Sequence, residues 1–391
     1  MDEIQSIFSF LDAGVSPWHA AAEAGRRLTE AGYERLDESQ PWSLVPGGKY
    51  YVTRNGSAVL AFRLPHTPVA SMRIALSHSD APTWRIKNAG VEKAGCIRLE
   101  TEGYGGMIMS SWLDRPLTAA GRVVVRTENG VEARLVYADQ DLLVIPSLAI
   151  HFDRGVNEGR KWDPQVDLQP VYGPAGCRPF PELLASEAGG CAVEDILAWD
   201  LCLVPRQRAV RVGPAGEFFM SPRIDDLECA GTTLAAFLEA GDGADAALVW
   251  GMLDNEEVGS SSRQGAQGTF LSDTLDRIFE SLGQSRSDRC RAEAASLVLS
   301  ADNGHAVHPN HPACVPVQRF ANRADMPGGS TLGNLQGHSL SSPMLDIGLA
   351  QLAMHSAVET AGTEDVGYMI RAVRSFYQTP FTCAGDGVYR F

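Results

Sequence analysis

The sequence predicts an α/β fold that is interrupted by an inserted β-rich domain. The chain has 391 residues, of which 44% are hydrophobic, so it has enough apolar material for a large core. From residue 223 onward, apolar strand-like runs alternate with helical stretches, which is typical of α/β proteins. Residues 86–214 instead hold short strands and turn signals. We therefore expect residues 1–85 and 215–391 to form one discontinuous domain and residues 86–214 to form the insert.

The amino-terminal part contains a well-marked helix. Ser16 can cap this helix, Pro17 suits its first turn, and Gly32 follows its last turn. Apolar residues then alternate with others in short runs, which indicates strands. We expect the strands of this part at 50–52, 57–62 and 72–78.

The insert and the carboxy-terminal part differ in their patterns. In the insert, an Asn129-Gly130 turn between the apolar runs 122–125 and 135–137 predicts a hairpin, and residues 142–150 form its most apolar stretch. The carboxy-terminal part has longer periodic segments with glycine at their ends. There we expect helices at 227–240, 273–282 and 350–360 and strands at 246–252, 295–300 and 344–347.

Charge and cysteine usage exclude several classes of protein. The net charge is −15, from 48 acidic and 33 basic residues, so a nucleic-acid binder or a protein of anionic membrane surfaces is disfavoured. No apolar run approaches the ~20 residues that span a bilayer. The start of the chain is acidic, unlike a secretory signal. The eight cysteines include no Cys-x-x-Cys pair, which argues against a zinc ribbon and a disulfide framework. We expect a soluble, cytoplasmic protein.

Polar clusters directly follow three apolar strands, at 77–80, 254–257 and 300–302. Ligands of open α/β sheets lie beyond the carboxyl ends of the strands, so these distant segments could meet at one site. Asp225, at an expected helix start, and His355, on the expected last helix, would complete a set of two histidines and at least four carboxylates. Zinc, manganese and cobalt prefer such ligands.

Four carboxylates at close range would repel one another unless cations lie between them. Two metals sharing one carboxylate would resolve this repulsion and could hold a hydroxide between them as nucleophile. Glu256 and Glu257 are neighbours, and adjacent side chains diverge in an extended segment. One could therefore bind metal while the other accepts a proton from water.

Each of these residues also has a plainer interpretation when taken alone. A single histidine is more often structural than a metal ligand, and an adjacent Glu-Glu pair is usually solvated. Asp225 and Asp226 could simply cap the following helix.

The motifs taken together and in this order resemble the aspartyl aminopeptidase family of dinuclear zinc aminopeptidases, over nearly the whole chain. The motifs that carry the resemblance are Gly47–Asn55, Ser77-His78-Ser79-Asp80-Ala81-Pro82, Pro222-Arg223-Ile224-Asp225, Asp254-Asn255-Glu256-Glu257-Val258-Gly259-Ser260, Ser300-Ala301-Asp302, His305–Asn310, Asp325-Met326-Pro327-Gly328-Gly329-Ser330-Thr331 and Met354-His355-Ser356. The resemblance implies a mixed-sheet α/β/α metallopeptidase domain with an inserted β-rich dimerisation domain.

The resemblance also implies a division of the metal ligands. One metal would be held by His78, Asp225 and Glu257. The other would be held by Asp225, Asp302 and His355, so that Asp225 bridges the two ions. The ions would be zinc, with cobalt or manganese as alternatives.

Further roles follow from the same resemblance. Glu256 would be the general base, and Asp80 would orient His78 through its other ring nitrogen. Dimers would assemble into a dodecamer, and His151 would reach a neighbouring subunit's active site or simply be an ordinary histidine at a strand end. Gly328, Gly329 and Ser330 would contact the substrate, because glycines let backbone N–H groups approach a ligand closely.

The chain departs from the family pattern after Asn310. Family members carry a longer segment there, with a strand, a helix and the pocket lysine and tyrosine, whereas here Asn310 is followed closely by residues 315–320. The cationic partner of an acidic substrate side chain would be lost with that segment. Arg319 or Arg323 could replace it, since arginine binds carboxylates bidentately, or both could face solvent.

The sequence therefore predicts a metal-dependent aminopeptidase that hydrolyses the amino-terminal residue of peptides, with a possible preference for acidic residues. Peptides would be the substrates, and copies of the chain would be the protein partners. Two alternatives stay open. One is a catalytically impaired relative that acts as an oligomeric scaffold, and the other is a related dimetal amidohydrolase.

Overall fold

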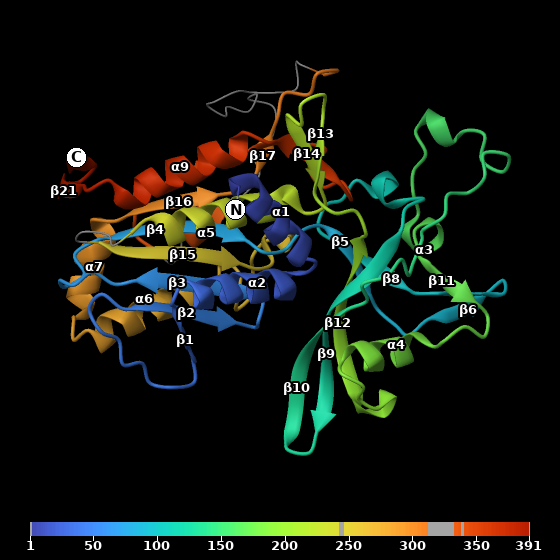
Figure 1. Cartoon of the computed structure of the whole chain (residues 1–391), viewed down its shortest axis with the longest axis horizontal. Helices are drawn as coiled ribbons and strands as arrows, with labels where there is room; N and C mark the ends of the chain where they lie inside the picture. Colours follow the sequence, from blue (N-terminus) through green and yellow to red (C-terminus); the bar gives the residue numbers. More distant parts are fainter. Residues whose placement is uncertain (1, 242–245, 312–331, 338–339, 391) are drawn as a thin grey trace.

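A mixed seven-stranded sheet forms the centre of the larger domain in the computed structural model, which describes residues 2–241, 246–311, 332–337 and 340–390 (Figure 1). The strand order is β1-β2-β3-β15-β4-β16-β18. β15, β4, β16 and β18 are parallel, whereas β3 is antiparallel to both of its neighbours. The strands are β1 Glu34–Leu36, β2 Lys49–Arg54, β3 Ala58–Arg63, β4 Met72–His78, β15 Ala247–Leu253, β16 Leu297–Ala301 and β18 Met344–Ile347.

Helices cover both faces of this sheet because its strands bury side chains on both sides. Ala61 and Trp250 belong to one core, and their neighbours Phe62 and Val249 belong to the other. The first face packs against α1 Glu3–Ala13, α2 Pro17–Glu30, α5 Ile224–Glu239 and α9 Asp365–Gln378. The second face packs against α6 Phe270–Ser281, α7 Arg286–Ala294 and α8 Leu332–Gln336. The expected α/β/α architecture is confirmed.

The insert folds around a core of its own, at the right of Figure 1. Its five-stranded sheet has the order β10-β9-β12-β5-β8, and a three-stranded sheet has the order β11-β7-β6. Its elements are β5 Thr83–Ile86, β6 Val91–Lys93, β7 Cys96–Arg98, β8 Thr101–Tyr104, β9 Leu117–Thr127, β10 Gly130–Tyr137, α3 Pro164–Asp167, β11 Val171–Pro174, α4 Phe180–Glu187 and β12 Ile196–Pro205. β5 pairs with β8 and β12, so the pairing favours domain boundaries just before Thr83 and just after Pro205.

The expected helix over 350–360 is wrong. This stretch forms β19 Ala350–Leu352 and β20 Glu359–Gly362, joined by a loop in which Ala353 and His355 have positive φ angles. Both strands belong to a further sheet of order β13-β14-β20-β19-β17. Pairing with β14 Phe218–Ser221 fixes β20 as a strand, and this long-range contact overrides the local helical pattern. The other strands are β13 Val210–Val212 and β17 Gly304–His305.

The last helix is α9, in which Val366, Ile370, Val373 and Tyr377 lie on one buried face. α6 begins at Phe270, three residues before its expected start. A small hairpin of β21 Thr382–Gly385 and β22 Val388–Arg390 follows α9. Within the described part of the chain, no helix combines the length and the apolar character needed to cross a membrane.

Candidate metal centre

Three strands deliver polar side chains to one edge of the central sheet. His78 is the last residue of β4, Asp302 directly follows β16, and Asp254 directly follows β15. β4 lies between β15 and β16 and is parallel to both, so the three carboxyl ends meet at the same edge. The convergence expected from the sequence therefore occurs in the structure.

Two more elements reach this edge from the sides. Asp225 follows β14 and has a non-helical backbone at the start of α5, with φ −77° and ψ 109°. His355 lies in the β19–β20 loop with φ 66°, and not on a helix as expected. A left-handed conformation is uncommon for a residue with a Cβ and marks positions where the backbone is held by its surroundings.

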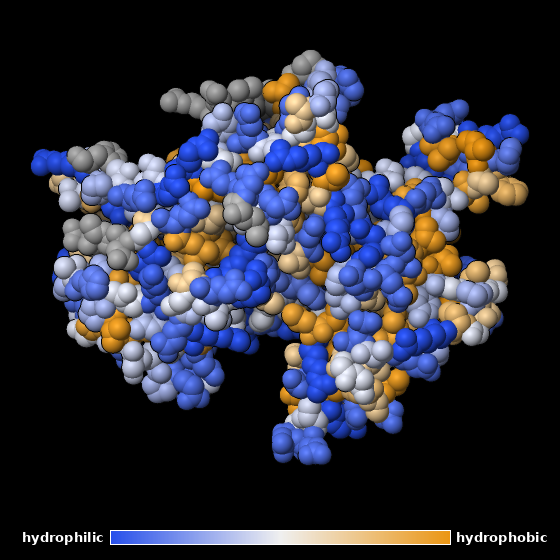
Figure 2. Space-filling view, viewed as in Figure 1, coloured by the Kyte–Doolittle hydropathy of each residue, from blue (hydrophilic) through white to orange (hydrophobic). Residues whose placement is uncertain are grey.

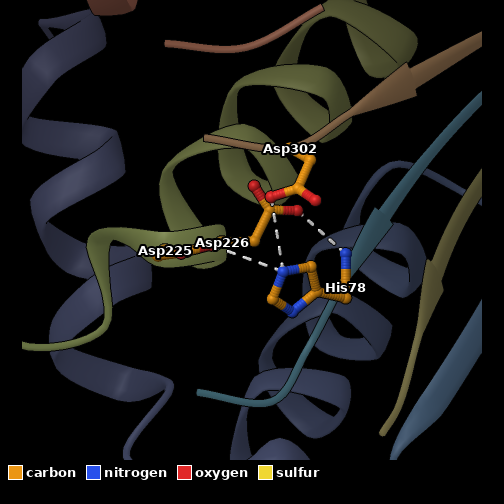
Figure 3. A group of neighbouring side chains, drawn as sticks. All are labelled: His78, Asp225, Asp226 and Asp302. Atoms are coloured by element: carbon orange, nitrogen blue, oxygen red, sulfur yellow. Dashed lines mark hydrogen bonds and ion pairs between the residues drawn. The ribbon is translucent and has the colours of Figure 1, made fainter. Parts of the chain in front are cut away.

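A first group of possible metal ligands comprises His78, Asp225, Asp226 and Asp302 (Figure 3). The His78 Nε2 atom lies 3.4 Å from Asp225 Oδ1 and 3.6 Å from Asp302 Oδ1. The three acidic side chains thus surround the imidazole of a histidine that is itself buried.

A second group comprises Asp225, Glu257 and His355. The His355 Nε2 atom lies 3.3 Å from Asp225 Oδ2 and 3.3 Å from Glu257 Oε1. Asp225 therefore belongs to both groups and offers a different oxygen to each. The expected sharing of Asp225 agrees with this geometry, but the expected division of the other ligands does not, because Glu257 lies with His355 and Asp302 lies with His78.

The second nitrogen of each imidazole contacts a backbone carbonyl. His78 Nδ1 lies 3.0 Å from the Asp80 carbonyl oxygen, and His355 Nδ1 lies 2.7 Å from the Gly106 carbonyl oxygen. A carbonyl oxygen only accepts, so each Nδ1 carries a proton and donates it, and each Nε2 is left facing the carboxylates. In this orientation Nε2 is the nitrogen of each histidine that would bind a metal ion.

Asp80 holds the turn that carries the two glutamates. Its Oδ1 accepts a hydrogen bond from the Glu256 backbone N–H at 3.0 Å, and its Oδ2 accepts one from the Glu257 backbone N–H at 3.2 Å. Asp80 Oδ1 also lies 3.4 Å from His78 Nδ1. This carboxylate therefore contacts both the first histidine and the Glu256–Val258 turn.

The charges of the site shift several pKa values. Burial raises the pKa of Glu256 to about 7; His78 opposes this shift, and the Asp302, Asp80 and Asp225 carboxylates add to it. Burial and the neighbouring Asp225 raise the pKa of Glu257. These shifts show how unfavourable so many negative charges are at this position without a cation.

Orphaned oxygens show that the residues fit a metal ion. Asp225 Oδ1, Asp226 Oδ1 and Glu257 Oε1 are buried and, among the described residues, accept no hydrogen bond. Buried polar atoms are normally paired, but Asp225 Oδ1 lies 3.4 Å from His78 Nε2 and Glu257 Oε1 lies 3.3 Å from His355 Nε2. A mixed set of imidazole nitrogens and carboxylate oxygens is typical of zinc sites.

Two further buried acidic residues belong to the site, although the sequence alone indicated no metal-binding role for either of them. Asp226 Oδ2 accepts a hydrogen bond from the His78 backbone N–H at 2.9 Å. Glu359 accepts hydrogen bonds from the backbone N–H groups of Asp225, at 3.1 Å, and His355, at 2.7 Å. Asp226 adjoins Asp225 in a pair that suggested only a helix cap, and Glu359 lies where a helix was expected.

Other expected site residues lie elsewhere or outside the described part. His151 is exposed on the insert and belongs to neither ligand group. Gly328, Gly329 and Ser330 lie outside the described residues, as do Arg319 and Arg323. The Glu256 side chain is half-buried beside the two groups without being part of either.

Comparison with known proteins identifies relatives over nearly the whole chain. The family model described as aminopeptidase I zinc metalloprotease (M18) matches residues 10–315 and 312–377. A probable M18 family aminopeptidase 2 of Clostridium acetobutylicum is 36% identical, over 95% of this chain and 98% of the relative. The solved structure of Chaetomium thermophilum mApe1 has a TM-score of 0.85 and 27% identity, over 96% of each chain. The S. cerevisiae mApe1 dodecamer has a TM-score of 0.82 and 24% identity, over 96% of this chain and 98% of that chain.

The comparisons also concern the segment that family members are expected to carry after the position of Asn310 and that this chain is expected to lack. The alignment with the Clostridium acetobutylicum relative spans 425 positions, so at least 34 of them (425 − 391) hold no residue of this chain. The family model matches in two pieces that meet at 312–315. The alignment therefore contains positions that this chain lacks, and the two pieces of the family match meet just after Asn310.

Replacing Asp225 tests whether the two groups bind metal. We expect Asp225→Ala to lose most of its bound zinc, because the shared carboxylate contributes to both groups. Elemental analysis of the folded protein after dialysis against a zinc buffer measures this loss.

Glu239→Gln is the matched control, since it removes an exposed carboxylate from the far end of the same helix, α5. Its zinc content should equal that of the wild type. An Asp225→Ala variant with undiminished zinc would contradict the metal assignment.

Proposed function

The chain belongs to the M18 family of metal-dependent aminopeptidases, and we propose that its site binds two zinc ions that share the Asp225 carboxylate. The observation that carries this proposal is the position of the two Asp225 oxygens. One lies 3.4 Å from His78 Nε2 and the other lies 3.3 Å from His355 Nε2. A carboxylate with one oxygen in each ligand group is suited to bridge two cations. His78 and Asp302 would complete one site, and Glu257 and His355 would complete the other.

The chemistry of the reaction is the hydrolysis of the first peptide bond of a substrate. Bound cations would lower the pKa of a water molecule and polarise the scissile carbonyl group. Glu256 would accept the proton of this water and later donate it to the leaving amine. A carboxylate can take both roles in turn, because it accepts the proton of the water and then releases it to the amine.

The remaining roles concern positioning and substrate binding. Asp80 would orient His78 and fix the turn that carries Glu256 and Glu257, as its hydrogen bonds suggest. The acidic residues around the two groups would favour the positively charged free amine of a substrate, which supports an exopeptidase. Gly328, Gly329 and Ser330 would contact the substrate backbone. A preference for acidic amino-terminal residues would need a cation from the segment that contains Arg319 and Arg323.

Replacing Glu256 tests the general base. Glu256→Gln should keep its zinc but lose roughly 10²–10⁴-fold in kcat, because an amide cannot accept the proton of the water. Steady-state kinetics and zinc analysis on the same sample measure the two properties. Glu239→Gln should keep both activity and zinc, and full activity of Glu256→Gln would show that another group is the base.

A substrate panel separates the proposed aminopeptidase from its two alternatives. Aminoacyl chromogenic substrates with acidic, basic and apolar residues should be hydrolysed only when their amino group is free. Turnover of amino-blocked substrates alone would indicate the amidohydrolase. A folded, zinc-loaded chain that hydrolyses no substrate would indicate the scaffold.

We also propose that the chain forms homo-oligomers through its insert and that His151 acts in a neighbouring subunit. Leu148, Ile150 and Phe152 flank His151, and all three side chains are exposed on the single chain. Figure 2 shows hydrophobic residues, in orange, on the projecting part of the insert at the upper right of the view. Exposed apolar patches of this kind often mark protein–protein contacts. A yeast protein of the same fold was solved as a dodecamer.

Mixing two inactive variants tests whether His151 acts across the interface. His151→Ala should reduce kcat, and so should Glu256→Gln. Refolding the two chains together should restore part of the activity, because a hybrid oligomer contains sites with an intact Glu256 and a neighbour's intact His151. If the mixture is only as active as the sum of its parts, His151 does not act in a second subunit.

A further inference from the structure

Tyr104 connects the insert to the site of the larger domain. It is the last residue of β8, and in the antiparallel β5–β8 ladder it lies opposite Thr83, three residues after Asp80. Arg85 of β5 lies over its ring, 4.4 Å from the centroid. The short distance along the chain from Asp80 to β5 therefore places the tyrosine ring directly beside the Asp80 carboxylate.

The Tyr104 hydroxyl makes two hydrogen bonds in the site. It donates to Asp80 Oδ2 at 2.6 Å and accepts from Asn255 Nδ2 at 2.9 Å. The same Asp80 oxygen accepts the Glu257 backbone N–H, and Asn255 begins the Glu256–Val258 turn. The Tyr104 hydroxyl thus bonds both to Asp80, which accepts the backbone N–H groups of the two glutamates, and to Asn255, which directly precedes them.

The residues that follow Tyr104 contact the other ligand group. The Gly106 carbonyl oxygen lies 2.7 Å from His355 Nδ1, and the Ile108 N–H donates to the His355 carbonyl oxygen at 2.9 Å. Gly105 has φ 71°, and a Cβ built there would lie 3.2 Å from the Glu257 Cβ. Residues 104–108 therefore run closely along the site, and a side chain at position 105 would be strained by the positive φ and would crowd Glu257.

We infer that Tyr104 is a positioning residue, through which the insert holds the Glu256–Val258 turn in its catalytic geometry. The inference rests on the proposed function, since it takes Glu256 as the base and Glu257 as a metal ligand. Without the hydroxyl, Asp80 loses a donor and Asn255 loses an acceptor, while the ring still fills its place. The turn would then move more freely, although every ligand and the base would remain in the chain.

Tyr104→Phe in the full-length chain tests the inference with two independent measurements. Hydrogen exchange of residues 254–260, in the EDTA-treated and the zinc-loaded protein, should become about tenfold faster, because the hydrogen bonds to a charged group that restrain the turn are weakened. In the zinc-loaded protein, kcat should fall about ten- to a hundredfold, as for other residues that orient metal ligands, with KM and zinc content nearly unchanged.

Tyr137→Phe is the matched control. Tyr137 is also in the insert, and its hydroxyl accepts a hydrogen bond from Arg206 at 2.7 Å, whereas Tyr104 bonds to Asp80 and Asn255. Its loss should change neither the exchange of residues 254–260 nor kcat. Unchanged exchange in Tyr104→Phe overturns the inference, and so does faster exchange spread evenly over the whole insert. A wild-type chain without aminopeptidase activity overturns the proposed function instead, and the exchange measurement still decides whether Tyr104 restrains the turn.

Discussion

The concentration of negative charge at the carboxyl edge of the central sheet is the constraint on which the site depends. Asp80, Asp225, Asp226 and Glu359 are buried there, and Glu257 lies close by. Like charges repel strongly in a medium of low dielectric constant, so each carboxylate needs a donor or a cation. Backbone N–H groups satisfy Asp80, Glu359 and one oxygen of Asp226. The remaining oxygens of Asp225 and Glu257 lie beside the two imidazoles, where a bound cation would offset their negative charge.

The central strands end at the candidate metal centre, but several of its side chains are held there by residues whose backbone lacks the conformation of a regular helix or strand. Asp225 is non-helical at the start of α5, while Asn255 and His355 are left-handed. Such conformations are unfavourable in isolation, and they persist where the surroundings over-determine them. Glu359 supplies this restraint for Asp225 and His355, because it accepts the backbone N–H of each.

The sequence was informative where a residue's place follows from the strand next to it. His78, Asp302 and the 254–257 cluster directly follow apolar runs, and parallel strands must bring such ends together. The backbone around His355 could not be predicted in this way, because pairing of β20 with a strand some 140 residues earlier decides its structure. The division of ligands between the two groups depends on side-chain directions, and these are set only when α5 and the β19–β20 loop pack together.

The insert joins the larger domain directly beside the candidate metal centre, and its residues contact several residues of that site. Its first strand begins three residues after Asp80, and its residues 105 and 106 run along Glu257 and His355. An insert without influence on the site would need no hydrogen bonds to the turn that carries Glu256 and Glu257. Because the insert and the metal centre share Asp80 and Asn255 through Tyr104, a displacement of β8 alters the support of Glu256 and Glu257. Any contact that fixes the insert therefore also favours the geometry in which the two glutamates are held.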